Sequence, residues 1–392
     1  MNNSAEIVIV GGGIVGCCIA FHLTRMGQEG VVLLEKDSLG SGSTGRAAGV
    51  VSQMHWNETD VQLVQESTTQ FRRMAEVYPD QVQFHQIGML RLVSHATEAD
   101  LLKQRVAVQQ TLGVNIEMWD GRWLNELAPE LAVEDVVAAA YCATDGYADP
   151  HEMANAFARQ AQEHGAQIRT DTALTGIALR DGSVEAVMTN RGRIATRILV
   201  NAAGVHGQAV AEMAHLQLPL KPYRTQMLAY ELSDLDVDIT ALPIVHDVSH
   251  EFYFRPEEAG NTLLVGDGTE ERESDPFRFK HNADRDFLES AAERILHRLP
   301  CVKDAKWVSG WAGLCNATPD RHPLLGEHPD VRGFMFAVGF NGYGFMRAPA
   351  IGRAVAEMIL GAEPTIDLSR FHVSRFHRNP PGDFPIREGF TL

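Results

Sequence analysis

The apolar pattern at the start of the chain predicts a strand, a glycine turn, a helix and a second strand. Residues 7–10 form a short apolar run that is typical of a buried parallel strand. Ile19, Leu23 and Met26 then recur at helical spacing. The run VVLLE at residues 31–35 predicts the second buried strand. Together these elements form one β–α–β unit.

Helical and extended patterns alternate through the rest of the chain. We expect amphipathic helices over residues 58–78, 98–112 and 282–298, and a strand over residues 84–94. Asp149 and Pro150 mark the start of another helix, which Gly165 can end. From residue 221 to 304 the pattern changes to strands separated by turn signals. The sequence therefore predicts an α/β fold, α+β overall, in which segments of two domains alternate.

The last informative region has the pattern of a strand, a glycine loop and a helix. The loop GFNGYG at residues 339–344 precedes the helix, and Pro349 suits the first helical turn. Ile351 and Val355 belong to the buried face of the helix. The loop therefore directs the positive end of this helix, with its free N–H groups, at whatever lies above it.

Three glycines at the first strand–helix junction have the GxGxxG spacing of dinucleotide-binding turns. Gly11 permits the tight turn, Gly13 lets a pyrophosphate approach the backbone, and Gly16 lets helix and strand pack closely. Glu35, at the end of the second strand, can accept hydrogen bonds from an adenosine ribose. The unit predicts a bound dinucleotide, and a glycine turn without a ligand is the alternative. It does not distinguish FAD from NAD.

A second run of small residues, GSGSTGRAAGVVSQ at residues 40–53, favours FAD. Small side chains permit the close approach of a flat, bulky group, and Ser43, Thr44 and Arg46 offer hydrogen-bond donors. A nicotinamide-binding fold would more usually continue here with regular βα units. The alternative is a flexible loop, but the change to AAGVV predicts the start of an ordered strand.

Composition and charge exclude several classes of protein. The 392 residues carry a net charge of −17 without a basic cluster, which argues against nucleic-acid binding. Five cysteines without metal-ligand spacing predict no metal site and fit a reducing compartment. No apolar stretch is long enough to span a membrane, at about 18 residues. We therefore expect a cytoplasmic protein without a membrane span.

The informative motifs follow one another in the order GGGIVG, Glu35, GSTGRAAG, VNAAG, WAGL…TPDRHPLLG and GFNGYGFMRAPAIG. This ordered set resembles the glycine oxidase/sarcosine oxidase family of FAD-dependent amine oxidoreductases, in the D-amino-acid-oxidase superfamily. The resemblance implies a Rossmann-like FAD-binding domain of residues 1–84, 141–220 and 305–392. It also implies a discontinuous, mostly antiparallel-sheet substrate domain of residues 85–140 and 221–304.

By this resemblance, FAD is bound non-covalently by residues from the glycine turns and the loops between them. These are Gly11, Gly13, Ile14, Val15, Gly16, Glu35, Lys36, Ser43, Thr44, Arg46, Ala47, Ala48, Gly49, Leu174, Ala203, Gly204, Gly313, Gly339, Asn341, Gly342, Tyr343, Gly344, Phe345 and Met346.

The family chemistry is oxidation of a C–N bond by hydride transfer to flavin N5, followed by hydrolysis of the imine. The resemblance implies a small secondary amine or amino acid as substrate, an N-substituted glycine such as sarcosine or iminodiacetate, or proline. Oxygen or another acceptor would reoxidise the flavin, and a partner subunit or homo-oligomer is compatible. Two alternatives are the catalytic subunit of a multi-component dehydrogenase and a non-catalytic flavoprotein that acts in assembly.

Departures from the family pattern leave the substrate open. Arg46 stands where dimethylglycine dehydrogenases have a flavin-linked histidine, and Gly313 where monomeric sarcosine oxidases have a flavin-linked cysteine. Glycine oxidases have a substrate-binding arginine where this chain has Cys315. No catalytic residue is assigned. The candidate substrate-binding residues are Gln53, His55, Tyr253, Arg255, Cys315, Tyr343 and Arg347.

Overall fold

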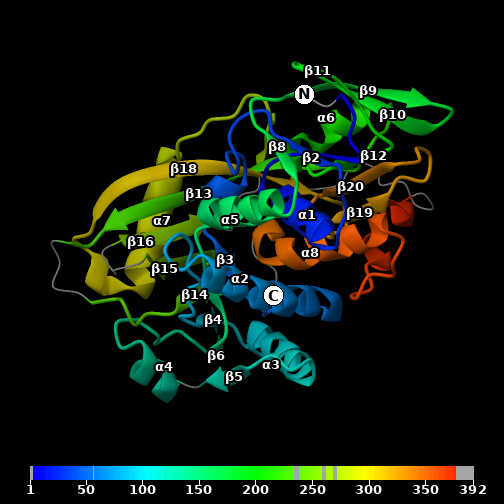
Figure 1. Cartoon of the computed structure of the whole chain (residues 1–392). Helices are drawn as coiled ribbons and strands as arrows, with labels where there is room; N and C mark the ends of the chain where they lie inside the picture. Colours follow the sequence, from blue (N-terminus) through cyan, green and yellow to red (C-terminus); the bar gives the residue numbers. More distant parts are fainter. Residues whose placement is uncertain are drawn as a thin grey trace.

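The structure, a computed structural model, describes residues 3–55, 57–119, 121–233, 238–257, 262–267 and 272–376. Residues 377–392, which the sequence assigns to the FAD-binding domain, lie outside the described residues. Two large sheets, each with its own helices, organise the described part of the chain (Figure 1).

A six-stranded sheet carries the glycine turn that the sequence predicts. Its strands follow the order β19 (Leu324–Glu327), β20 (Phe334–Val338), β12 (Ile198–Asn201), β1 (Ile7–Val10), β2 (Val31–Leu34) and β8 (Gln167–Arg169). All neighbours are parallel except β19 and β20. β1 lies between β12 and β2, and its four residues are buried. Burial on both faces explains why the strand is a continuous apolar run.

Four helices pack together beside this sheet, as the middle of Figure 1 shows. They are α1 (Ile14–Arg25), α2 (Glu58–Val77), α5 (Pro150–Glu163) and α8 (Gly344–Ile359). α1 packs against α5 and α8, and α2 packs against α8. The side chain of Asp149 accepts a hydrogen bond from the Glu152 amide at 2.8 Å, so α5 begins where the sequence predicts. The other helices are α3 (Ala96–Thr111), α4 (Gly121–Leu127), α6 (Gly207–Glu212) and α7 (Arg285–Arg298).

Helix α8 begins earlier than the sequence predicts. Pro349 lies inside the helix and not in its first turn, because the helix starts at Gly344. Contacts of the preceding turn hold this extension in place: Phe345 stacks on Phe71 of α2 with ring centroids 4.9 Å apart. The amide of Ala350, next to the proline, donates to the hydroxyl of Ser67 at 3.1 Å. Neighbouring side chains thus support a helix that the proline alone would interrupt.

A nine-stranded sheet forms the second layer. Its order is β17 (Arg272–Glu273), β13 (Lys221–Glu231), β16 (Thr262–Asp267), β15 (Phe252–Pro256), β14 (Ile244–Asp247), β4 (Met89–Val93), β6 (Ala138–Cys142) and β5 (Ile116–Trp119), and β18 (Lys306–Ala317) pairs with β13. The neighbours are antiparallel except β14 and β4. The mostly antiparallel sheet expected for the second domain is therefore present.

One row of paired residues crosses the larger sheet. Pairing runs from strand to strand through Met118, Ala140, Arg91, His246, Tyr253, Gly266, Met227 and Trp311. Residues that are paired directly across strands project from the same face of a sheet. The alternate positions, such as Leu90, Val245 and Phe254, belong to an apolar core that includes residues of α4 and α7. The row therefore occupies the face opposite these helices.

Two smaller sheets complete the described fold. β9 (Leu174–Arg180), β10 (Ser183–Thr189) and β11 (Gly192–Ala195) form an antiparallel sheet, and β3 (Val50–Val51) pairs with β7 (Gly146–Tyr147). The expected domain boundary between residues 304 and 305 precedes β18, although β18 pairs along the larger sheet. Among the described residues, no helix is long and apolar enough to cross a membrane.

Candidate functional site

A cavity of about 940 Å³ is lined by the glycine turn of the smaller sheet and by one face of the larger sheet. Its volume is near the upper end of the range of about 300–1,000 Å³ that is usual for ligand pockets. We call the part near Gly11, Gly13 and Glu35 the nucleotide end. The part near His55, Arg91 and Tyr253 is called the amine end.

Backbone contacts explain why glycine occupies the turn at the nucleotide end. Gly11 has φ of +114°, and a Cβ atom there would lie 2.4 Å from the carbonyl oxygen of Ala202. A Cβ atom on Gly16 would lie 2.0 Å from the carbonyl oxygen of Gly11. Gly16 is absent from the described cavity lining and serves the packing of α1 on β1, whereas Gly11 and Gly13 line the cavity. The spacing therefore produces the close-packed turn that the sequence predicts.

The carboxylate of Glu35 is held at the end of β2 by two backbone amides. Gly12 donates to its Oε2 at 2.7 Å, and Asp37 donates to its Oε1 at 2.9 Å. Each carboxylate oxygen keeps a further lone pair, and Glu35 lines the cavity. An adenosine ribose could therefore donate to it here.

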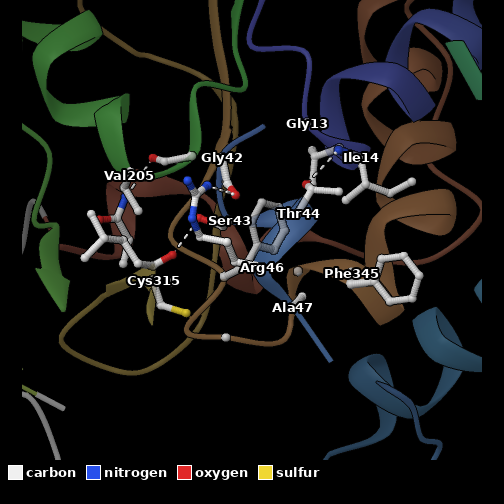
Figure 2. A pocket seen from close by; sticks show the side chains of 18 of the residues that line it. Gly13, Ile14, Gly42, Ser43, Thr44, Arg46, Ala47, Val205, Cys315 and Phe345 are labelled. Carbon is white, nitrogen blue, oxygen red and sulfur yellow. Dashed lines mark hydrogen bonds between the residues drawn. The ribbon is translucent and has the colours of Figure 1, made fainter. Parts of the chain in front are cut away.

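The second small-residue run forms the wall next to the turn. Thr44 accepts a hydrogen bond from the Ile14 amide at 3.1 Å, and Ser43 donates to the carbonyl oxygen of Leu314 at 2.5 Å. Arg46 donates to the carbonyl oxygens of Ser41 and Gly42. Figure 2 shows Thr44 meeting the start of α1 and Arg46 reaching toward Gly42. This segment thus joins the first helix to β18 of the larger sheet.

The loop before α8 forms the wall between the two ends. Asn341 has φ of +52°, and its side chain accepts from the Thr318 amide at 3.1 Å and donates to the carbonyl oxygen of Gly339 at 2.8 Å. Tyr343 precedes the first turn of α8 and provides no side-chain cap. Gly344 and the two residues after it line the cavity. The first turn of α8, whose backbone amides have no partner within the helix, therefore borders the cavity.

The described residues at the nucleotide end fit FAD. The cavity lining includes the starts of α1 and α8, which favour phosphate and a negatively charged ring edge. Lys36 and Arg46 supply positive charge. Asn316 also lines the cavity, and its Oδ1 atom is buried without a hydrogen-bond partner in the described part of the chain. A ligand with N–H or O–H donors would satisfy that oxygen.

The amine end combines aromatic side chains with uncharged imidazoles. Burial lowers the pKa of His55 to about 3. Burial also lowers the pKa of His246 well below its usual range. Both imidazoles are therefore neutral near pH 7. The ring of His55 meets that of Tyr343 edge-on at 5.6 Å, and Tyr253 and Cys315 line the same cavity.

Three of the predicted substrate-binding residues lie outside the described cavity lining. Gln53 donates to Thr144 at 2.7 Å, and Arg255 pairs with Glu257 at 2.8 Å. Arg347 pairs with Asp60 at 2.5 Å. Their polar groups bind protein atoms, which is the physical reason that the structure does not bring them to a ligand. The lining does contain His55, Tyr253, Cys315 and Tyr343.

The predicted cofactor-binding residues other than Gly16 all line the cavity. Sequence reasoning missed several lining residues that come from strands of the larger sheet: Met89, Arg91, Tyr223, Thr225, Gln226, Met227 and His246. One available signal was a polar residue within an apolar strand, as in MLRLV for Arg91 and PIVHDV for His246. Alternation indicates which face such a residue shares, but it does not identify the neighbouring strand.

One group of potential metal ligands lies elsewhere. Atoms of Asp135, His250 and His297 lie within 4.8 Å of one another. Arg298, however, donates to both oxygens of Asp135, at 2.8 and 3.0 Å. The guanidinium of Arg298 therefore already binds the carboxylate that a metal ion would need as a ligand.

Comparison with known proteins agrees with the fit of FAD to this cavity. The sequence profile described as "FAD dependent oxidoreductase" (DAO) matches residues 6–358. Mitochondrial sarcosine dehydrogenase of Homo sapiens is 30% identical over 393 residues, covering 96% of this chain and 42% of that protein. Glycine oxidase of Geobacillus kaustophilus is 26% identical, with 96% and 98% covered. The chain thus spans less than half the length of the sarcosine and dimethylglycine dehydrogenases that it matches.

A solved structure gives the same result. L-proline dehydrogenase from P. horikoshii has a TM-score of 0.90 and 30% identity, with 96% of this chain and 99% of that chain covered. The profile match extends over most of the chain and includes the glycine turn, the second small-residue run and the start of α8. The family and the cofactor predicted from the sequence are confirmed: this chain belongs to the DAO family of FAD-dependent oxidoreductases.

Proposed function

We propose that the protein oxidises the C–N bond of a small amino acid whose nitrogen carries a substituent. Sarcosine, N,N-dimethylglycine, iminodiacetate and proline represent this substrate class. The names of several similar proteins support the proposal, since they are a sarcosine dehydrogenase, a dimethylglycine dehydrogenase and an L-proline dehydrogenase. This chain covers less than half of the first two proteins, so it is a proposal that this chain has their activity.

The amine end of the cavity is the observation that carries this proposal. It contains the neutral imidazoles of His55 and His246 and the guanidinium of Arg91, which is charged near pH 7. Among the described lining residues, the carboxylates are Glu35 and Asp37, and both are at the nucleotide end. A cavity of this charge favours a ligand that bears a carboxylate and whose amine is neutral when it reacts.

When bound, FAD would supply the hydride acceptor for oxidation of the carbon next to the substrate nitrogen, and the resulting imine would be hydrolysed by water. The residues of this chain position the substrate and exclude water. Tyr253, Tyr343 and Met227 provide the apolar surface of the amine end. His55 and His246 offer uncharged hydrogen-bonding atoms, which do not repel an amine that is about to become positively charged.

The test is anaerobic mixing of the purified yellow protein with sarcosine, N,N-dimethylglycine, iminodiacetate and L-proline. At least one is expected to bleach the visible absorbance of the flavin. Methoxyacetate, in which oxygen replaces the amine nitrogen of sarcosine, is the matched control and should leave the colour unchanged. If all four amines leave the flavin oxidised, the proposed substrate class is wrong.

Readmission of air to the bleached protein then distinguishes the electron acceptors. Rapid return of the colour supports an oxidase, whereas slow return that a quinone or a second flavoprotein accelerates supports a dehydrogenase. We also propose that the flavin is held without a covalent bond. Acid precipitation should therefore leave the yellow colour in the supernatant, and a yellow pellet would contradict this.

A further inference from the structure

Arg91 is a charged residue in the middle of an otherwise apolar strand. Leu90 and Leu92, its neighbours in β4, are buried in the core on the opposite face of the sheet. Arg91 lies between Ala140 and His246 in the row that crosses the larger sheet, and it lines the cavity. Among the lining residues that the described strands of this sheet contribute, it is the one arginine, lysine or carboxylate residue.

Each of the three arginines that are buried among the described residues has a carboxylate partner. Arg255 pairs with Glu257, and Arg347 pairs with Asp60. Arg298 pairs with Asp135 and Asp247. A buried guanidinium without such a partner is costly, because it loses its hydration and gains no opposite charge.

Arg91 has no such partner among the described residues. It takes part in none of the ion pairs that they form, and its Nε atom is buried without a hydrogen-bond acceptor. Burial lowers the pKa of Arg91 to about 10, which still leaves the group protonated near pH 7. The half-buried guanidinium is therefore charged without an ion-pair partner among the described residues, and the buried carboxyl group of Asp145 favours this charge without pairing with it.

A second cation, Arg105, adds to the excess of positive charge near Arg91. Arg105 of α3 also has a buried nitrogen, Nη1, without a partner among the described residues. It lies close enough to contribute, after burial, to the lowering of the Arg91 pKa. Arg105 does not belong to the described cavity lining, so only Arg91 of these two can touch a ligand there.

A carboxylate fits the position of Arg91 better than a phosphate of the cofactor does. The glycine turn and the start of α1 bind phosphate in this type of fold, and they belong to the smaller sheet. Arg91 belongs to the larger sheet, beside the neutral His246 and near Tyr343. A guanidinium can donate two parallel hydrogen bonds to a carboxylate.

We infer that Arg91 binds the carboxylate of the amino-acid substrate, an inference that rests on the proposed function. Arg91 would then have the substrate-binding role that the sequence predicts for Arg255 and Arg347, whose charges are already paired. The reacting C–N bond would be oriented from the face of the larger sheet, and the free acid group would contribute both affinity and selection against simple amines.

The experiment measures equilibrium binding to the flavin-loaded protein by isothermal titration calorimetry. The probes are methoxyacetate and the neutral methoxyacetamide, which have the same size and no oxidisable amine. Wild-type protein is expected to prefer methoxyacetate. Arg91→Gln should weaken methoxyacetate binding at least about tenfold and leave methoxyacetamide unchanged, because one charged pair of hydrogen bonds is lost. Arg91→Lys keeps the charge but not the paired geometry, so its loss should be smaller.

Arg180→Gln is the matched control, because Arg180 is an exposed arginine of β9 and this substitution also removes one positive charge. It should bind both probes as the wild type does. If Arg91→Gln keeps the preference for methoxyacetate while sarcosine still bleaches the wild-type flavin, this inference is wrong and the proposed function stands. If the wild type is neither bleached by the amines nor able to bind methoxyacetate, both are wrong. Loss of flavin from both Arg91 variants would assign Arg91 to the cofactor and overturn the inference.

Discussion

The two ends of the cavity are built in different ways. At the nucleotide end, backbone groups and small residues make the site, and most come from a few short segments such as 11–16 and 43–49. At the amine end, side chains from separate strands meet because of their register, as Arg91 and His246 do. A backbone site is visible as spacing within one segment, whereas a side-chain site depends on which strands become neighbours. The two ends should therefore respond differently to substitution.

The largest expected effect is at Gly11. In Gly11→Ala the new Cβ atom would lie 2.4 Å from a backbone oxygen at a positive φ of +114°, so the turn must move. We expect the purified variant to be colourless, with FAD affinity reduced at least about 1,000-fold, or about 4 kcal/mol. The measurement is the ratio of flavin to protein, followed by titration with FAD.

Gly176→Ala is the control for this substitution. Gly176 lies in β9 and outside the described cavity lining, and a Cβ atom there would make ordinary contacts of 3.7 Å with Met188. It should keep the flavin. A yellow Gly11→Ala protein would mean that the glycine turn does not hold the cofactor as tightly as its geometry implies.

The second effect concerns Arg91, at the amine end, and Arg347, which lies outside the described cavity lining. Arg347 pairs with the buried Asp60 and also donates to the carbonyl oxygens of Phe340 and Tyr343. Burial alone would raise the pKa of Asp60, but the Arg347 charge and nearby donors hold it at about 2. Arg347→Met leaves this carboxylate unpaired and should lower the free energy of unfolding by about 3–5 kcal/mol.

Arg91→Met is expected to give the opposite result for stability. It removes a half-buried charge that forms no ion pair with the described residues, so unfolding should be unchanged or more costly by about 1 kcal/mol. Thermal unfolding of both variants, each with saturating FAD, measures the difference. Equal losses for the two variants would show that Arg91 is a structural residue like Arg347.

The sequence predicts the first of these ends well and the second only in part. The strand at residues 7–10 and the glycine turn follow from local pattern, and the structure has β1 at these residues. Arg255 was a reasonable candidate because it shares a strand face with Tyr253. The structure instead pairs it with Glu257 and directs its Nε to the carbonyl oxygen of Ala48. The sequence does not reveal such pairing, because it depends on how separate segments dock.

A smaller effect concerns acid stability, in which a buried histidine outside the described cavity lining and one at the amine end should behave alike. Burial lowers the pKa of His22, in the last turn of α1, to about 4, and that of His55 to about 3. In the unfolded chain each histidine takes up a proton near the ordinary histidine pKa of 6.5. Their contribution to stability is therefore complete above pH 6.5 and is lost as the pH falls toward the folded-state values.

At pH 5 each of these histidines should cost about 2 kcal/mol relative to pH 7. His22→Gln and His55→Gln should each reduce the pH dependence of unfolding by that amount, whatever they do to stability at pH 7. The measurement is urea unfolding at both pH values with FAD in excess. A variant with the full wild-type pH dependence would mean that its histidine is not held neutral in the folded protein.

The smallest effect is expected at Cys315. Its side chain lines the cavity on β18, and a Cβ atom built on Gly342 would lie 3.9 Å from its sulfur. A thiol at this position is not needed for hydride transfer, and we propose that it carries no bond to the flavin. Cys315→Ser replaces sulfur by a smaller atom, so the flavin content should be unchanged and kcat/KM should change less than about threefold, or about 0.7 kcal/mol. A colourless Cys315→Ser protein would instead move this residue from the amine end to the cofactor, and the separation between the two ends would no longer hold.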